Sequence, residues 1–233
     1  MTETYDRTYF ETSCGRPYRR DEHWLEFFGG IADRIVEDLS PATVLDAGCA
    51  MGFLVEALRD RGVDAHGIDI SEYALAQVRE DVAPHVRRAS LTEPLDRQYD
   101  LIVCIEVLEH LQPEEARAAL DNLCAHADEL LLSSTPSDFR EPTHVNVRPT
   151  SDWVAELARR GFLADAGYDA SYVTPWARRF RRRGFPVWQA LEAYERRVSR
   201  AEEETGTLRA ELERERRLRA EATTPPRRRR FRL

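Results

Sequence analysis

The chain has 233 residues, of which 42% are apolar, and a formal net charge of −8. This size and composition suffice for one globular domain with a further segment, and they exclude a disordered or fibrous protein. The sequence contains no apolar run of about eighteen residues and no secretory signal at its acidic N-terminus, so it predicts a cytoplasmic protein without a membrane span. The scattered Cys14, Cys49, Cys104 and Cys124 are expected to be reduced thiols.

The charge is distributed unevenly along the chain. Residues 1–177 hold 16 arginines and 33 acids, a net charge of −17, whereas residues 178–233 hold 18 arginines and 9 acids, a net charge of +9. The sequence contains no lysine, which excludes lysine-based catalysis. A nucleic-acid substrate is disfavoured, because the larger part of the chain would repel phosphates.

The first forty residues are predicted to form an aromatic segment and a helix. Residues 1–20 contain Tyr5, Tyr9, Phe10 and Tyr18, and such a segment either packs against the core or forms a flap over a ligand site. From Asp21 to Leu39 the apolar residues recur at steps of three and four, which predicts an amphipathic helix with Asp21 as its N-cap.

Strands and helices are predicted to alternate in the middle of the chain. The predicted strands are 43–47, 64–69, 86–90, 99–105 and 129–134, and the predicted helices are 53–61, 72–82 and 113–125. Alternation with short connections predicts an α/β fold in which helices cover both faces of a parallel sheet and ligands bind at the carboxyl ends of the strands. A helix at 151–161, capped by Ser151, and strands at 162–170 and 171–174 are expected to follow.

The C-terminal part is predicted to be a long charged helix. Over residues 184–222, apolar residues between Leu191 and Leu212 alternate steps of three and four, which is a heptad pattern. A coiled-coil dimer and a single helix folded back on the domain both fit, and self-association or partner binding is favoured. Residues 223–233 form an Arg-rich tail, predicted to be disordered, that either contacts nucleic acid or anionic lipid or is a solvated extension.

A glycine-punctuated turn follows the first predicted strand of the sheet. Asp46, Gly48, Ala50 and Gly52 alternate with other residues immediately before a predicted helix. Glycine allows the backbone to approach a ligand, and the free N–H groups at the start of a helix attract polar or anionic atoms. The spacing differs from the Gly-x-Gly-x-x-Gly of dinucleotide-binding proteins.

This turn resembles the first motif of class I S-adenosylmethionine (SAM)-dependent methyltransferases, roughly Val-Leu-Asp-x-Gly-x-Gly-x-Gly, with Ala50 in place of the middle glycine. Asp69 ends the next strand, as an acid does in that family, and Tyr99–Leu111 resembles the fourth-strand motif of the subgroup with the quinone-biosynthesis O-methyltransferases. The resemblance implies a Rossmann-like sheet over residues 41–183, an antiparallel strand pair at its edge, and SAM as cofactor.

The resemblance also implies roles for the residues at the carboxyl edge. Asp69 would accept hydrogen bonds from both ribose hydroxyls. The methionine part of SAM would lie against Gly48 and beside Ile105 and Glu106 at the end of the fourth strand. The remaining cofactor contacts implied are Asp46 and Gly52 at the turn, Ile70, Ser90 and Leu91 around the adenine, and Tyr18 or Arg19 at the SAM carboxylate.

The acceptor side is predicted in the loop of residues 135–149. Methyl transfer to a hydroxyl is helped by a general base, and His144 in this loop is the candidate, with a structural hydrogen bond as the alternative role. Residues 143–149, followed by Trp153, resemble bacterial methyltransferases found with sugar-modifying enzymes. Glu109 and His110 are interpreted as scaffold, and the sequence shows no cluster of Asp, Glu and His with metal-ligand spacing, so no metal is predicted.

Together these features predict four segments: an N-terminal flap and helix (1–40), a SAM-binding core (41–183), a heptad-like helix (184–222) and a tail (223–233). The leading hypothesis is SAM-dependent O-methylation of a small polar metabolite, sugar or glycan. N-methylation of an amino sugar or amine is an alternative that would not need His144. A second alternative is a non-catalytic assembly module that acts through the C-terminal helix.

Overall fold

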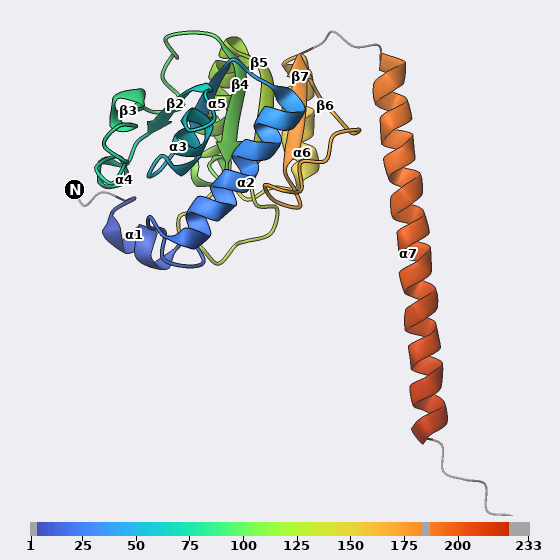
Figure 1. The fold of residues 1–233 in the computed structure, drawn as a ribbon. Coiled ribbons are helices and arrows are strands. Elements are labelled where there is room, and N and C mark those ends of the chain that lie inside the picture. The colour runs from blue at the N-terminus through green and yellow to red at the C-terminus, as the bar shows by residue number, and fades with distance from the viewer. Residues whose placement is uncertain (1–3, 183–186, 224–233) are drawn as a thin grey trace, which may run out of the picture. The chain divides into compact units, whose positions relative to one another are not determined.

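The computed structural model describes residues 4–182 and 187–223, and the chain divides into two compact units, Met1–Phe185 and Pro186–Leu233. The first unit contains a seven-stranded sheet with the strand order β3-β2-β1-β4-β5-β7-β6 (Figure 1). The strands are β1 (Thr43–Ala47), β2 (Asp64–Asp69), β3 (Val86–Arg88), β4 (Tyr99–Ile105), β5 (Ala127–Ser133), β6 (Phe162–Ala164) and β7 (Arg178–Arg182).

Helices connect most of these strands. They are α1 (Arg7–Thr12), α2 (Glu22–Leu39), α3 (Phe53–Arg59), α4 (Glu72–Leu75), α5 (Pro113–His126), α6 (Thr150–Arg159) and α7 (Val187–Thr223), with short 3-10 turns at Ala83–His85 and Leu108–His110. The strands β1 to β5 pair in parallel, and β7 runs antiparallel to both β5 and β6. The predicted fold is therefore confirmed, and the carboxyl ends of the parallel strands share one edge of the sheet.

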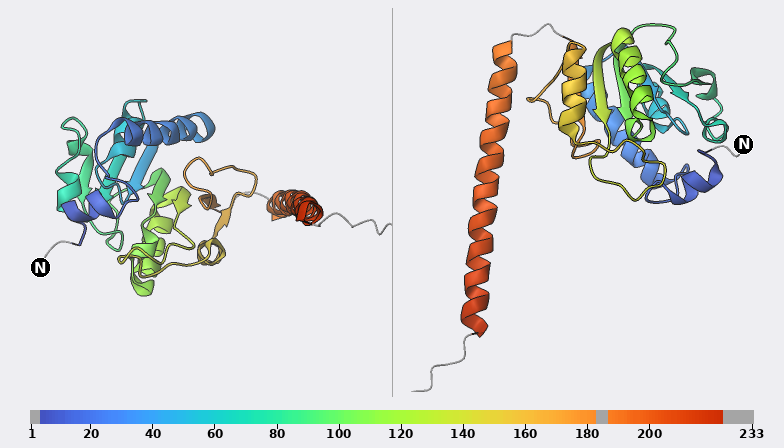
Figure 2. Two further views of the ribbon diagram at one scale, coloured as in Figure 1. Left: turned by 90° about the horizontal axis from the view of Figure 1, so that it is seen from below. Right: turned by 180° about the vertical axis from the view of Figure 1, so that it is seen from behind.

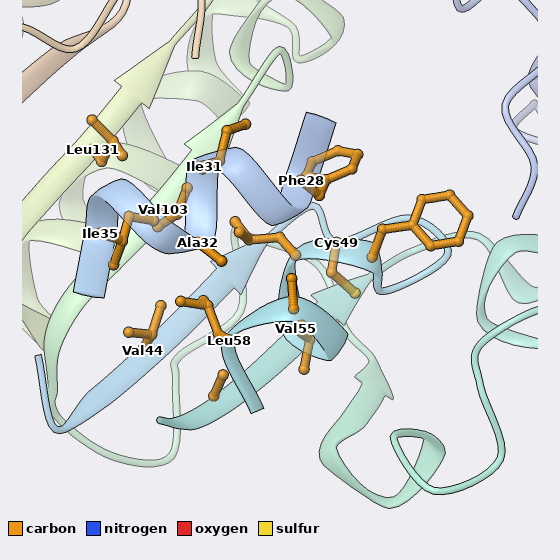
Figure 3. Close-up of a cluster of buried hydrophobic side chains, with 14 of the residues drawn as sticks. Phe28, Ile31, Ala32, Ile35, Val44, Cys49, Val55, Leu58, Val103 and Leu131 are labelled. Carbon is orange, nitrogen blue, oxygen red and sulfur yellow. The ribbon is translucent and has the colours of Figure 1, made fainter. Parts of the chain in front are cut away.

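Helices cover both faces of the sheet, and strand residues alternate between the two. Val44 and Val103 pack in a buried cluster with α2 and α3 (Figure 3). Leu45 and Ile102 point to the opposite face, where they pack with α5 and α6. The view from behind in Figure 2 shows α5 and α6 on this second face. This alternation places Asp46, at the end of β1, on the same side as Val44.

Helix α2 matches its prediction closely. The side chain of Asp21 accepts a hydrogen bond from the backbone N–H of Trp24 at 3.2 Å and so caps the helix. One face of the helix, with Phe28, Ile31 and Ile35, is buried against the sheet, as Figure 3 shows.

The helix predicted at 72–82 is wrong in length. Only Glu72–Leu75 is helical, and the N–H groups of Gln77 and Val78 bond to carbonyls three residues back, which is the 3-10 spacing. Further along, Arg79 forms ion pairs with Asp60 and Asp81. These pairs hold the segment in a turn conformation. Ser151 was also predicted wrongly as a helix cap, because α6 begins at Thr150 and Pro149 occupies the cap position.

The last pair of strands lies at other residues than predicted. Strand β6 covers only Phe162–Ala164, and its partner β7 is Arg178–Arg182 instead of 171–174. Strand β7 escapes sequence analysis because only Phe180 is apolar in it. Its Arg179 binds Glu129 at 2.6 Å and Asp165 at 3.4 Å, so acids on the neighbouring segments stabilise part of this basic strand. The antiparallel arrangement at the sheet edge agrees with the prediction.

The second unit consists of α7, whose 37 residues confirm the predicted long charged helix. The tail of residues 224–233 and the boundary near residue 183 lie outside the described residues. Within residues 4–182 and 187–223, no helix combines the length and apolar character that crossing a membrane requires.

Candidate functional site

The turn between β1 and α3 is held by its backbone. Gly48, Ala50 and Gly52 have φ angles of 92°, 46° and 72°, which all lie in the left-handed region. The N–H groups of Gly48 and Cys49 both donate to the carbonyl of Ile68, at 2.8 and 3.0 Å. The turn is therefore fastened to β2. Ala50 adopts a conformation that costs a non-glycine residue about 1–2 kcal/mol, and the surrounding hydrogen bonds hold it there.

Two features of the fold require glycine at position 48. A Cβ atom on Gly48 would lie 2.4 Å from Cγ2 of Val107, which is far inside van der Waals contact. The φ of 92° is also unfavourable for any side chain. Gly52 is less constrained, because a Cβ there would lie 3.3 Å from Val78. The contact of Gly48 with a cofactor stays a prediction.

Asp69 joins this turn to the start of α4. Its Oδ2 atom accepts a hydrogen bond from the N–H of Ala50, and its Oδ1 atom accepts one from the N–H of Ser71, both at 2.8 Å. Each carboxylate oxygen has two lone pairs, so the group can accept further hydrogen bonds from a pair of neighbouring hydroxyls. Ile70 lies beside it with 42% of its surface exposed.

The predicted adenine contacts after β3 differ in exposure. The side chain of Leu91 is buried, with 5% exposed, and packs in the core cluster with α5. Ser90 is half-buried, and its hydroxyl lies 2.8 Å from that of Thr92. The amide of Asn122 on α5 supports this loop by donating to the carbonyl of Leu91 at 2.9 Å. We therefore expect an adenine to meet Ser90 and Ile70 and not the side chain of Leu91.

Tyr18 lies near the turn, and Arg19 does not. The ring of Tyr18 packs 5.2 Å from that of Phe53 at the start of α3, and its pKa is raised by burial first and then by the negative charge of Asp46. Arg19 points to solvent with 74% of its side chain exposed and forms an ion pair with Asp21 at 3.7 Å. Tyr18 thus packs beside the start of α3 and Arg19 is exposed, and the contact of either residue with SAM stays a prediction.

Asp46 is a buried acid at the end of β1. Burial raises the pKa of its carboxyl to about 8, and the charge of Asp69 adds to the shift. Without a ligand this carboxyl therefore holds a proton at neutral pH.

SAM binding is expected to release close to one proton from Asp46 at pH 7. SAM carries a sulfonium and an ammonium group, and nearby positive charge favours the ionised carboxylate. The affinity should therefore rise as the pH increases to about 8. Calorimetric titration in buffers of different ionisation enthalpy measures the released protons. Asp46→Asn should release none, whereas Glu109→Gln should behave as the unchanged protein; equal release from Asp46→Asn would contradict the assignment.

Trp176, which sequence analysis missed, holds the end of β4 through Glu106. Glu106 follows Ile105 with a φ of 52°, and its N–H donates to the carbonyl of Ser133 at 3.1 Å. Its Oε1 atom accepts a hydrogen bond from Nε1 of Trp176 at 2.9 Å. Trp176 precedes β7, far from β4 in sequence, so no local pattern indicates this contact.

Glu109, His110 and His144 form a cluster at the same edge of the sheet. One ligand atom from each of the three lies within 4.8 Å of the others, and the two imidazole rings are 4.6 Å apart. The loop is fixed here because the carbonyl of Glu109 accepts hydrogen bonds from the N–H groups of Val145 and Asn146, both at 2.9 Å. Nδ1 of His144 lies 2.8 Å from the carbonyl of Asp138 and donates to it, which leaves a lone pair on Nε2.

Burial favours the uncharged forms of Glu109 and His110 in this cluster. Glu109 is fully buried, and its Oε2 atom has no well-formed hydrogen bond among the described residues, although the nearby hydroxyl of Ser134 acts to lower the pKa of this carboxyl. Burial, and then the charge of Glu106, raise the pKa of Glu109 to about 8, whereas burial, and then His144, lower the pKa of His110 to about 4. A carboxyl that gives up its proton and two imidazole nitrogens are suitable ligands for a divalent transition-metal ion, and such an ion would give Oε2 a partner.

The expectation that no Asp, Glu and His cluster exists therefore does not hold, although the absence of a bound metal stays a prediction. Glu109 and His110 are adjacent, but His144 reaches them only through the fold of the loop after β5. Sequence spacing alone could not have shown the cluster.

The N-terminal segment contacts both the start of α4, next to Asp69, and the cluster of Glu109, His110 and His144. The hydroxyl of Ser71 donates to the carbonyl of Tyr5 at 2.7 Å, and the hydroxyl of Tyr9 lies 3.5 Å from Nε2 of His110. Phe10 is buried with 5% exposed. Figure 1 shows α1 at the same end of the sheet as the loop after β5. The segment thus packs against the core, and its action as a flap stays a prediction.

The strand order, the antiparallel β7 and the glycine turn before α3 define the fold of the class I SAM-dependent methyltransferases. A family model described as "Methyltransferase domain" matches residues 18–190. The chain belongs to this methyltransferase-domain family.

Among curated proteins, the chain is similar to the ubiquinone biosynthesis O-methyltransferase of Pseudomonas paraeruginosa (strain DSM 24068 / PA7), with 31% identity over 121 residues. The match covers 48% of this chain and 49% of the relative, so the chain spans about half the length of the curated relatives it matches.

Two solved structures share the fold. One is the magnesium protoporphyrin IX methyltransferase of Synechocystis PCC 6803 with bound SAM, with 23% identity, a TM-score of 0.56 and coverage of 75% of this chain and 92% of that one. The other is an amino pentose methyltransferase of Micromonospora echinaspora, involved in calicheamicin biosynthesis, with 18% identity, a TM-score of 0.54 and coverage of 70% and 93%.

Proposed function

We propose that the protein transfers the methyl group of SAM to a hydroxyl oxygen of a small polar acceptor such as a sugar or a related metabolite. One observation carries the proposal. A turn fastened by Asp69, suited to a nucleoside, lies at the same edge of the sheet as an imidazole whose Nε2 lone pair is free, that of His144. Membership of the methyltransferase-domain family and the similarity to curated O-methyltransferases support it.

In this reaction the chain's residues bind, orient and accept a proton. Asp69 would hold the ribose and the turn at Gly48 would position the methionine part, so that the methyl group of SAM would face the acceptor oxygen. The carbon–oxygen bond forms as the carbon–sulfur bond breaks, and sulfur keeps the electron pair. Nε2 of His144 accepts the hydroxyl proton and passes it to solvent. The products are the methyl ether and S-adenosylhomocysteine.

A second arrangement of the same site is favoured by the Oε2 atom of Glu109, which has no well-formed hydrogen bond among the described residues. Glu109, His110 and His144 would then hold a divalent cation as ligands. Mn²⁺ or Zn²⁺ suits two imidazoles better than Mg²⁺, which prefers oxygen ligands. Such a cation lowers the pKa of a bound hydroxyl. His144 would then orient the acceptor as a ligand instead of serving as the base.

His144→Ala is expected to lower methyl transfer at least about 100-fold and to leave SAM affinity unchanged, because it removes only the acceptor-side group. Transfer of labelled methyl to a panel of sugars and polyols measures the rate, and His23→Ala, an exposed histidine on α2, is the control. Loss of activity on EDTA treatment and recovery with Mn²⁺ or Zn²⁺ would support the cation; insensitivity to EDTA would support the base.

An unchanged rate in His144→Ala would contradict the role of His144 and favour the alternative, N-methylation of an amine, since a neutral amine attacks without a base. A matching panel of amino sugars tests that alternative in the same assay.

A further inference from the structure

Helix α7 exposes a row of large apolar side chains. Seven such residues between positions 188 and 218 are 40–65% exposed: Trp188, Leu191, Tyr194, Val198, Leu208, Leu212 and Leu218. A helix of 37 residues is about 55 Å long, and a single charged helix of this kind gains little stability from its own residues. The apolar row indicates a surface that is covered by a partner.

The spacing of this row defines the geometry of the partner. With Leu191 as position a of a heptad, the seam consists of Leu191, Tyr194, Val198, Ala201, Thr205, Leu208 and Leu212. The β-branched Val198 and Thr205 occupy a positions, and Leu208 occupies a d position. In parallel coiled coils, β-branched residues at a with leucine at d favour two strands over three or four; the other two d positions here are Tyr194 and Ala201.

The charges that flank the seam are complementary to those of a second copy. In a parallel, in-register pair, each g position faces the e position five residues later on the other helix. All three charged pairs then have opposite signs, and the two-fold symmetry repeats each of them. They are Arg197 with Glu202, Glu204 with Arg209, and Glu211 with Arg216.

The antiparallel arrangement is less complementary. There g positions face g positions and e positions face e positions, and two alignments overlap most of both helices. Each alignment contains attractive pairs, such as Arg197 with Glu211 or Glu202 with Arg209, but each also contains like charges: Glu204 faces Glu204 of the other copy in one and Glu211 in the other. Only the parallel, in-register pair has opposite signs throughout, and like charges facing each other oppose association.

We propose that α7 forms a parallel, in-register, two-stranded coiled coil with α7 of a second copy of the chain. The two methyltransferase domains of the dimer then precede the coiled coil at the same end. The heptad pattern ends where Glu215 and Arg219 occupy the seam positions, and these two residues pair within the helix at 3.8 Å. The proposal does not depend on the reaction that the first unit catalyses.

Complementary charge reversals test the pairing in the full chain. Glu204→Arg/Glu211→Arg and Arg209→Glu/Arg216→Glu each place like charges in a parallel dimer, so each is expected to raise the dimer dissociation constant at least about tenfold. An equimolar mixture of the two variants restores all pairs and should form heterodimers. Glu203→Arg/Glu213→Arg, which makes the same change in charge away from the seam, is the matched control and should remain a dimer of 26.9 kDa chains.

Sedimentation equilibrium distinguishes monomer from dimer for each variant. A disulfide cross-link then tests whether the two α7 helices are parallel or antiparallel. Leu191→Cys, in a Cys14→Ser background, should cross-link to itself on oxidation only in a parallel pair, because the antiparallel partner places this position near the far end of the helix. A monomer at tens of micromolar would overturn the proposal. So would a dimer that Leu191→Cys fails to cross-link, or a mixture of the charge variants that stays monomeric.

Discussion

Asp69→Ala is expected to weaken SAM binding at least about 100-fold, because it removes two charge-assisted hydrogen bonds to the ribose hydroxyls. The variant also removes the acceptors for the N–H groups of Ala50 and Ser71, so the glycine turn loses its tie to the start of α4. Both effects reduce affinity in the same direction. Calorimetric titration with SAM, S-adenosylhomocysteine and NAD measures it, with micromolar binding of the first two expected and none for NAD.

Asp64→Ala is the matched control for this experiment. Asp64 begins β2 at the opposite end from Asp69 and forms an ion pair with Arg97 at 3.0 Å. Its loss should change surface charge and leave SAM affinity within about twofold. If Asp69→Ala bound SAM as tightly as Asp64→Ala does, the ribose assignment would be wrong. If the unchanged protein bound none of the three ligands, the assembly role of α7 would become the leading hypothesis.

Gly48→Ala is expected to destabilise the protein by about 3 kcal/mol or more and to abolish SAM binding. A side chain at φ 92° costs about 1–2 kcal/mol, and a Cβ atom placed 2.4 Å from Val107 adds a packing cost of similar size. Urea denaturation measures the free energy of unfolding.

Two further variants separate the two costs of Gly48→Ala. Gly62→Ala has a φ of 82° but open space around its Cβ, so it should lose only the backbone part, about 1–2 kcal/mol. Adding Val107→Ala to Gly48→Ala should recover part of the packing cost. Equal stability of the Gly48→Ala and Gly62→Ala variants would show that Val107 moves away without cost.

The sequence predicted those parts of the fold that local patterns encode. The alternation of strands and helices, the helix with the Asp21 cap and the turn from Asp46 to Gly52 depend on residues close together in the chain. Strand β7 was misplaced because it has a single apolar residue and its Arg179 is paired with Glu129 and Asp165, which come from other segments. Sequence patterns do not record such long-range pairs.

The same limit applies to the candidate site. Asp69 was singled out because strand ends and glycine turns are visible in sequence, and the structure places it against that turn. The contact of Trp176 with Glu106, and the approach of His144 to Glu109, depend on how two long loops fold over the sheet edge. Tyr18 and Arg19 were both proposed from the expected N-terminal flap; Arg19 is exposed to solvent, and its contact with SAM stays a prediction.

The two outer strands of the sheet, β3 and β6, have three residues each. Strand β3 carries Arg87 and Arg88, and Arg88 donates to the carbonyl of Ile70 at 3.2 Å. Strand β6 is apolar, but like β3 it is short, and short outer strands offer few free backbone groups to a strand from another molecule, which protects a sheet from edge-to-edge aggregation. The sheet therefore offers little edge for growth at either side, which agrees with the proposal that copies of the chain associate through α7.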